Sequence, residues 1–64
     1  MPEVIVYAAE GRSAEQKRGL MKEITEAVVN NFDVPATAVS VQIVESALDS
    51  KAKGGVPFSE RKKG

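Results

Sequence analysis

Cysteine and histidine are both absent from this sequence of 64 residues. Their absence excludes disulfide bonds, thiol chemistry and catalytic triads that use histidine, and it removes the usual ligands of structural zinc. A domain of this size buries only about 60% of the surface that its unfolded chain exposes. Because neither disulfides nor a bound metal can stabilise so small a core, we expect the chain to form an oligomer.

An excess of charge of one sign is also lacking, since nine basic and nine acidic residues give a formal net charge of zero. This balance does not indicate a nucleic acid or an anionic membrane as a partner. No apolar run approaches the roughly 20 residues of a membrane span, and the first residues lack the pattern of a secretion signal. We therefore expect one globular domain over residues 1–64, in the cytoplasm, with no nucleic-acid or membrane partner.

The first predicted element is a strand from Glu3 to Ala9, which is rich in β-branched residues and lies between Pro2 and Gly11. Its apolar residues are consecutive instead of alternating, which is typical of a strand covered on both faces. We expect a helix on one face and another subunit on the other.

A helix is predicted from Ala14 to about Asn31. Ser13 and Gln16 have the spacing of a capping box, in which each side chain accepts a hydrogen bond from the other residue's backbone N–H. Pro35 predicts that the helix ends before it, because proline disfavours helical conformation in the residue that precedes it. The predicted apolar stripe comprises Leu20, Ile24, Ala27 and Val28, with Met21, Val29 and Phe32 at its margins, and the polar side carries Lys17, Arg18, Lys22, Glu23 and Glu26.

A second strand is predicted over residues 39–45, where apolar and polar side chains alternate. Strand, helix and strand in this order form a βαβ unit with parallel strands, so the fold class is α/β (α+β). In the tail, Gly54 and Gly55 predict a tight turn within a short C-terminal β-hairpin or arm. This arm carries Val56 and Phe58, which we expect to pack on a neighbouring subunit.

Pro2 is the residue that indicates chemistry. An initiator methionine followed by proline is normally removed, which leaves a secondary amine at the start of a strand. In an apolar pocket beside a fixed cation the pKa of such an amine falls toward neutrality, because desolvation and like-charge repulsion both disfavour the protonated form. The amine can then act as a general base near pH 7. Alternatively, Pro2 merely precedes an edge strand, which proline tolerates.

Several short motifs lie in register along nearly the whole chain: Met1-Pro2, Glu10-Gly11-Arg12-Ser13, Glu15-Gln16-Lys17, Pro35, Thr37, Val39-Ser40-Val41, Glu45 and Gly54-Gly55. Each motif alone is a weak signal. Together they are specific, and with them the chain resembles 4-oxalocrotonate tautomerase and its short relatives.

The resemblance implies that the subunit pairs into a dimer and that three dimers form a hexamer. It implies a cofactor-independent isomerase that interconverts keto and enol forms of an unsaturated 2-hydroxy or 2-oxo acid, such as 2-hydroxymuconate in aromatic catabolism. In that role Pro2 is the catalytic base and Arg12 binds a substrate carboxylate, a task suited to a bidentate guanidinium. No metal takes part.

Two positions depart from the family pattern. The family's second arginine, which polarises the 2-oxo group, corresponds to Ser40, and an aromatic pocket residue corresponds to Lys51. Ser40 remains a candidate substrate-binding residue, although it donates one neutral hydrogen bond where an arginine donates a charged pair. Loss of such a donor costs roughly 10²–10³ in rate. Lys51 restores the charge only if it reaches the site from another direction.

Three interpretations therefore stay open. The first is a homohexameric tautomerase with a shifted or weaker substrate preference. The second is a subunit of a hetero-oligomer in which a related chain supplies the missing arginine, so that this chain is weakly active or structural. The third is a hydratase or dehalogenase of unsaturated acids that also depends on Pro2, and it requires a water-activating carboxylate that the sequence does not identify.

Overall fold

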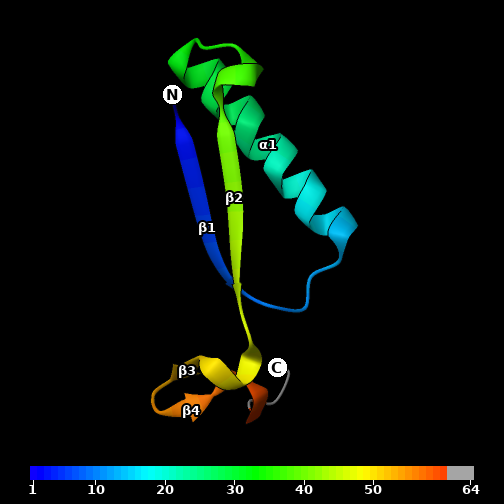
Figure 1. The fold of residues 1–64 in the computed structure, drawn as a ribbon, viewed down its shortest axis with the longest axis vertical. Coiled ribbons are helices and arrows are strands. Elements are labelled where there is room, and N and C mark those ends of the chain that lie inside the picture. The colour runs from blue at the N-terminus through cyan, green and yellow to red at the C-terminus, as the bar shows by residue number, and fades with distance from the viewer. Residues whose placement is uncertain (61–64) are drawn as a thin grey trace.

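The structure, a computed structural model, describes residues 1–60 of the chain. Its main unit is a parallel pair of strands, β1 (Glu3–Ala9) and β2 (Ser40–Ser46), with helix α1 (Ala14–Phe32) lying across one face (Figure 1). A 3₁₀ turn, η1 (Ala36–Ala38), leads into β2. The predicted βαβ unit with parallel strands is confirmed, and β2 begins one residue later than the sequence predicted.

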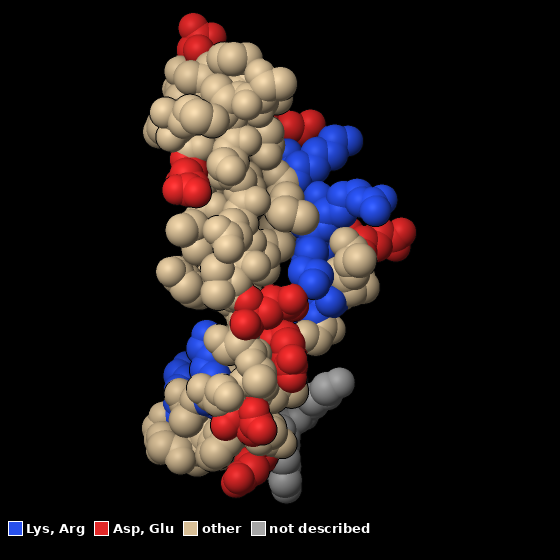
Figure 2. All heavy atoms as spheres, in the orientation of Figure 1, with Lys and Arg blue, Asp and Glu red and all other residues tan. Residues whose placement is uncertain are grey.

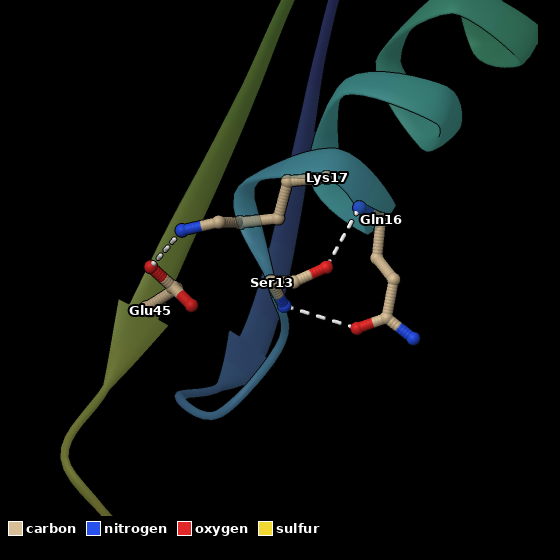
Figure 3. Close-up of polar contacts among 4 residues, drawn as sticks. All are labelled: Ser13, Gln16, Lys17 and Glu45. Carbon is tan, nitrogen blue, oxygen red and sulfur yellow. Dashed lines mark hydrogen bonds and ion pairs between the residues drawn. The ribbon is translucent and has the colours of Figure 1, made fainter.

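Local side-chain and backbone hydrogen bonds set both ends of α1. The Ser13 hydroxyl accepts from the Gln16 backbone N–H at 3.0 Å, and the Gln16 side-chain oxygen accepts from the Ser13 backbone N–H at 3.0 Å (Figure 3). At the other end Asp33 adopts a left-handed conformation with φ 57°, and its N–H donates to the Val29 carbonyl at 3.0 Å. The capping box is confirmed. No helix within residues 1–60 combines the length and apolar character needed to cross a bilayer.

The capping box gives a testable contribution to stability. Ser13→Ala is expected to lower the free energy of unfolding by about 1 kcal/mol, because the Gln16 N–H loses its acceptor. Urea unfolding at one fixed protein concentration measures this. The control is Ser59→Ala, at an exposed serine of the C-terminal arm, which should change stability by less than about 0.5 kcal/mol. Equal losses in the two variants would contradict the capping role.

The two faces of the strand pair differ in how well they are covered. Val6, Ala8 and Ile43 lie on the side of α1, where they line a hollow beneath the helix. The alternate residues of β1 point the other way, and Ile5 and Tyr7 are 44% and 71% exposed. The prediction that a helix covers one face is confirmed, and the prediction that another subunit covers the second face stays open.

The single chain is too open to be a self-sufficient domain. None of the described residues is fully buried, and Leu20 and Phe32 on the predicted helix stripe remain 43% and 64% exposed. The radius of gyration is 14.8 Å, against about 11 Å for a compact domain of this length. These features support association with further copies as the way in which the apolar surface is covered.

The C-terminal arm extends beyond the end of the strand pair that lies away from the N-terminus (Figure 1). Its β-hairpin turns at Gly54 and Gly55, whose φ angles of 63° and 83° favour glycine. The predicted hairpin is confirmed, whereas its packing on a neighbour stays a prediction. The elements of the arm are η2 (Leu48–Ser50), β3 (Ala52–Lys53), the antiparallel β4 (Val56–Pro57) and η3 (Phe58–Glu60).

Candidate active site

Pro2 and Ser40 lie together at the N-terminal end of the strand pair. Pro2 is half-buried, and its carbonyl oxygen accepts a hydrogen bond from the Ser40 backbone N–H at 3.0 Å. Met1 precedes Pro2 and is 96% exposed. The peptide bond between Met1 and Pro2, which must be cleaved to remove Met1, therefore lies next to an accessible residue. Only this removal converts the Pro2 nitrogen from an amide, which has no basic lone pair, into a secondary amine.

Arg12 lies at the opposite end, in the loop between β1 and α1. The loop is held on both sides: the Glu10 N–H donates to the Ser46 carbonyl at 2.9 Å, and the capped helix start follows at Ser13. Between them Gly11 has a φ of 124°, a conformation that side chains other than glycine's rarely adopt. Arg12 itself is exposed and has no ion-pair partner among residues 1–60. Its guanidinium is therefore available for an external carboxylate.

A hollow of about 240 Å³ adjoins Arg12 beneath the first turns of α1. An ion pair crosses it, in which Lys17 Nζ lies 2.9 Å from Glu45 Oε1 on β2, and each side chain is 30% exposed (Figure 3). The placement of Lys17 on the solvent side of the helix was wrong. Lys17 precedes Leu20 and Met21 by three and four residues, so it belongs to the face turned toward the sheet. The lining residues are Val6, Ala8, Arg12, Gln16, Lys17, Leu20, Ile43 and Glu45.

One chain does not bring its own Pro2 and Arg12 together. The seven residues of β1 separate them, which at about 3.3 Å per residue is roughly 23 Å. This is far longer than a small unsaturated acid. Within the described chain β1 pairs only with β2, so one edge of β1 stays free. The residues predicted for the site thus lie in two groups, Pro2 with Ser40 at one end of the strand pair and Arg12 at the other.

Lys51 has an aromatic neighbour that the sequence did not reveal. Its ammonium lies 5.8 Å from the centre of the Phe58 ring, and the Phe58 N–H donates to the Lys51 carbonyl at 2.7 Å. The hairpin brings these residues together although seven positions separate them. Where the family pattern has an aromatic side chain, this chain presents a lysine stacked on an aromatic ring.

Comparisons with known proteins agree with this architecture. The family model described as tautomerase enzyme matches residues 2–61. A probable tautomerase of Bradyrhizobium diazoefficiens is 54% identical over 95% of this chain and 91% of its own length. A 2-hydroxymuconate tautomerase of a Pseudomonas strain is 38% identical over 94% of this chain and 95% of its own. A heterohexamer 4-oxalocrotonate tautomerase from Chloroflexus aurantiacus superposes with a TM-score of 0.86 at 32% identity, covering 97% of this chain and all of the other.

The βαβ unit with its C-terminal hairpin is the fold of the 4-oxalocrotonate tautomerases. The chain belongs to the tautomerase family, and it is an isomerase enzyme.

Proposed function

We propose that this tautomerase uses the amine of Pro2, after removal of Met1, as the general base that interconverts enol and keto forms of an unsaturated 2-hydroxy acid. The observation that carries the proposal is the place of Pro2, half-buried at the start of β1 and directly after the exposed Met1. The 2-hydroxymuconate tautomerase that matches nearly the whole chain supports this substrate class.

The reaction requires two proton transfers, one from the substrate to the amine and one from the amine back to the substrate. The lone pair of the amine accepts the hydroxyl proton of the enol as the C2–O bond becomes a carbonyl. The double-bond electrons move to a carbon further along the chain, and the protonated amine returns a proton to that carbon. The product is an isomer of the substrate, so no oxidant, cofactor or metal is consumed. Arg12 holds the substrate carboxylate through a charged, two-point contact, and this fixes the reacting carbon relative to the amine.

Two copies join the halves of the site. Antiparallel pairing of two β1 edges across a two-fold axis puts the first residue of one strand opposite the last residue of the other. Pro2 of one copy then lies at the Arg12 end of its partner, and the dimer holds two equivalent sites. In the proposed homohexamer of three such dimers, the exposed sheet face with Ile5 and Tyr7 and the C-terminal arm are covered by further copies.

Purification of the chain alone tests this function. We expect a hexamer lacking Met1, verified by size-exclusion chromatography with light scattering and by intact mass. This hexamer should accelerate ketonisation of 2-hydroxymuconate or phenylenolpyruvate at least about 100-fold over buffer, the lower range for a positioned general base. A well-folded, Met1-free hexamer with no activity on either compound would refute the proposal for the homo-oligomer.

The second candidate is a subunit of a hetero-oligomeric tautomerase. Two observations favour it: the neutral Ser40 beside Pro2, and the similarity to a heterohexamer from Chloroflexus aurantiacus. In that arrangement a related chain supplies the arginine. Activity that appears only after co-expression with a paralogous chain, and a mixed complex in native mass spectrometry, would distinguish this candidate from the first.

A further inference from the structure

Charges of both signs meet at the end of the strand pair that carries Arg12. In Figure 2 basic side chains gather over the first half of α1, and acidic side chains lie just below them, where the strand pair meets the C-terminal arm. Glu45 on β2 is the register partner of Ala8 on β1, and it lines the same hollow as Arg12. The hollow therefore contains both a guanidinium and a carboxylate, two groups that pair readily.

The backbone holds the loop of Arg12 close to Glu45. The Glu10 N–H donates to the carbonyl of Ser46, the residue after Glu45, at 2.9 Å, and Arg12 follows Glu10 by two positions. The arginine side chain is long and presents five N–H donors. It nevertheless forms no ion pair with any carboxylate of residues 1–60. Another group must therefore hold the carboxylate of Glu45.

Lys17 is that group. It reaches from the first turns of α1 across to β2, where its Nζ lies 2.9 Å from Glu45 Oε1 (Figure 3). Each of the two side chains is only 30% exposed, so solvent screens their attraction less than it screens a pair on the open surface. The two opposite charges cancel. The guanidinium of Arg12 is left as the uncompensated charge of the hollow.

The other carboxylates near the loop are directed away from the hollow. Glu10 accepts a hydrogen bond from the Leu48 N–H, at the start of the arm, at 3.4 Å. Glu15 is exposed in the first turn of α1 and does not line the hollow. Among the residues that do line it, all of them within residues 1–60, only Glu45 is acidic. The pairing of Glu45 thus decides whether Arg12 stays available.

We propose that Lys17 is a positioning residue, which holds Glu45 in an ion pair and so keeps the guanidinium of Arg12 free for the substrate carboxylate. The proposal rests on the proposed function, since it concerns Arg12 as the residue that binds this carboxylate. Without Lys17, Glu45 pairs with Arg12 and competes with the substrate. A partly exposed ion pair shifts an equilibrium by up to about fivefold, so a substrate that must displace Glu45 binds more weakly by a similar factor.

Two substitutions that break the same ion pair test the proposal in the Met1-free oligomer. Lys17→Met leaves the carboxylate of Glu45 unpaired, and it should raise KM about three- to sixfold with kcat within about twofold. Glu45→Gln removes the competing charge and should not raise KM. An ion pair that only stabilised the fold would make the two variants behave alike. The substrate is whichever of 2-hydroxymuconate and phenylenolpyruvate the wild type turns over.

Further variants separate an effect through Arg12 from a direct contact of Lys17 with the substrate. Glu45→Gln added to Lys17→Met should reverse most of the rise in KM, and Lys17→Arg, which can still pair with Glu45, should largely avoid it. In an Arg12→Ala background Lys17→Met should change KM less than about twofold, because no guanidinium is left to capture. Lys17→Gln keeps a polar side chain and replaces Lys17→Met if that variant does not assemble.

A matched control removes the same charge elsewhere on the helix. Lys22 is exposed on α1 and has no ion-pair partner among residues 1–60. Lys22→Met should leave KM within about twofold, since an exposed charge distant from the hollow is screened by solvent and salt. A rise in KM equal to that of Lys17→Met would attribute the effect to overall charge and overturn the proposal.

The remaining outcomes are distinct. An unchanged KM in Lys17→Met, or equal rises in Lys17→Met and Glu45→Gln, would overturn the role of Lys17 while leaving the tautomerase function in place. The full rise in the Arg12→Ala background would show that Lys17 contacts the substrate itself, which would also overturn it. No turnover of either compound by the wild type would instead overturn the proposed function.

Discussion

Pro2→Ala is expected to reduce kcat/KM by about 100-fold or more while leaving the oligomer and the secondary structure intact. Alanine also permits removal of Met1, but the resulting primary amine differs in basicity and lacks the ring that fixes the nitrogen at the start of β1. Because Pro2 donates no backbone hydrogen bond in the structure and its carbonyl contact to Ser40 needs no proline ring, the fold should tolerate the change. Steady-state kinetics with circular dichroism and size-exclusion chromatography make the measurement.

The state of the N-terminus provides the internal control for this experiment. Protein that retains Met1 has an amide at Pro2 and should be inactive, whereas the processed form of the same preparation should be active. Intact mass identifies each form, and treatment of the retained form with a methionine aminopeptidase should restore activity. Unchanged turnover in Pro2→Ala, or full activity with Met1 still attached, would show that the amine is not the base.

Mixing two impaired variants should restore activity, because Pro2 and Arg12 of one chain lie roughly 23 Å apart. Arg12→Ala is expected to raise KM about ten- to 100-fold through loss of a charged two-point contact. When Arg12→Ala and Pro2→Ala chains are unfolded together and refolded at equal amounts, half of the sites receive an intact Pro2. Half of those also receive an intact Arg12 from a different chain. The mixture should therefore reach about a quarter of the wild-type kcat/KM if two chains of a symmetric oligomer form each site.

Two controls make this result specific. Each variant refolded alone should keep its own reduced kcat/KM, and the two variants mixed without unfolding should recover activity only as fast as subunits exchange. A mixture that performs no better than the mean of its two parents would contradict the shared site. Arg12→Lys in place of Arg12→Ala should recover part of the parental activity, since lysine keeps the charge and loses the bidentate geometry.

The secondary structure could be predicted from the sequence because interactions between near neighbours determine it. The Ser13–Gln16 capping box and the β-branched run of β1 act between near neighbours, so the structure confirms the corresponding elements almost to the residue. The glycine pair of the hairpin is equally local. Lys17 shows where this reasoning failed. A lysine suggested the solvent side, whereas its spacing from Leu20 and Met21 and its carboxylate partner Glu45, 28 positions away, hold it against the sheet.

The candidate site was less accessible to prediction, for geometric reasons. Family resemblance indicated Pro2, Arg12 and Ser40 as site residues, and the strand that was predicted from Glu3 to Ala9 separates Pro2 from Arg12 in the structure. The contact between Lys51 and Phe58 depends on the hairpin closing, and the hollow beside Arg12 depends on the angle at which α1 crosses the strands. Both are consequences of tertiary packing. In the proposed site, the length of β1 requires that Pro2 and Arg12 come from different copies.

The open architecture of the single chain has a consequence for how the enzyme is handled and how long it lasts. Within residues 1–60 no residue of the single chain is fully buried, so in the proposed oligomer folding and association are coupled by mass action. The thermal midpoint of such a protein depends on enzyme concentration, and dilution alone lowers the fraction of complete sites. For the proposed oligomer, the residence time of a subunit in the assembly, more than the stability of an isolated chain, then sets the working lifetime of the catalyst.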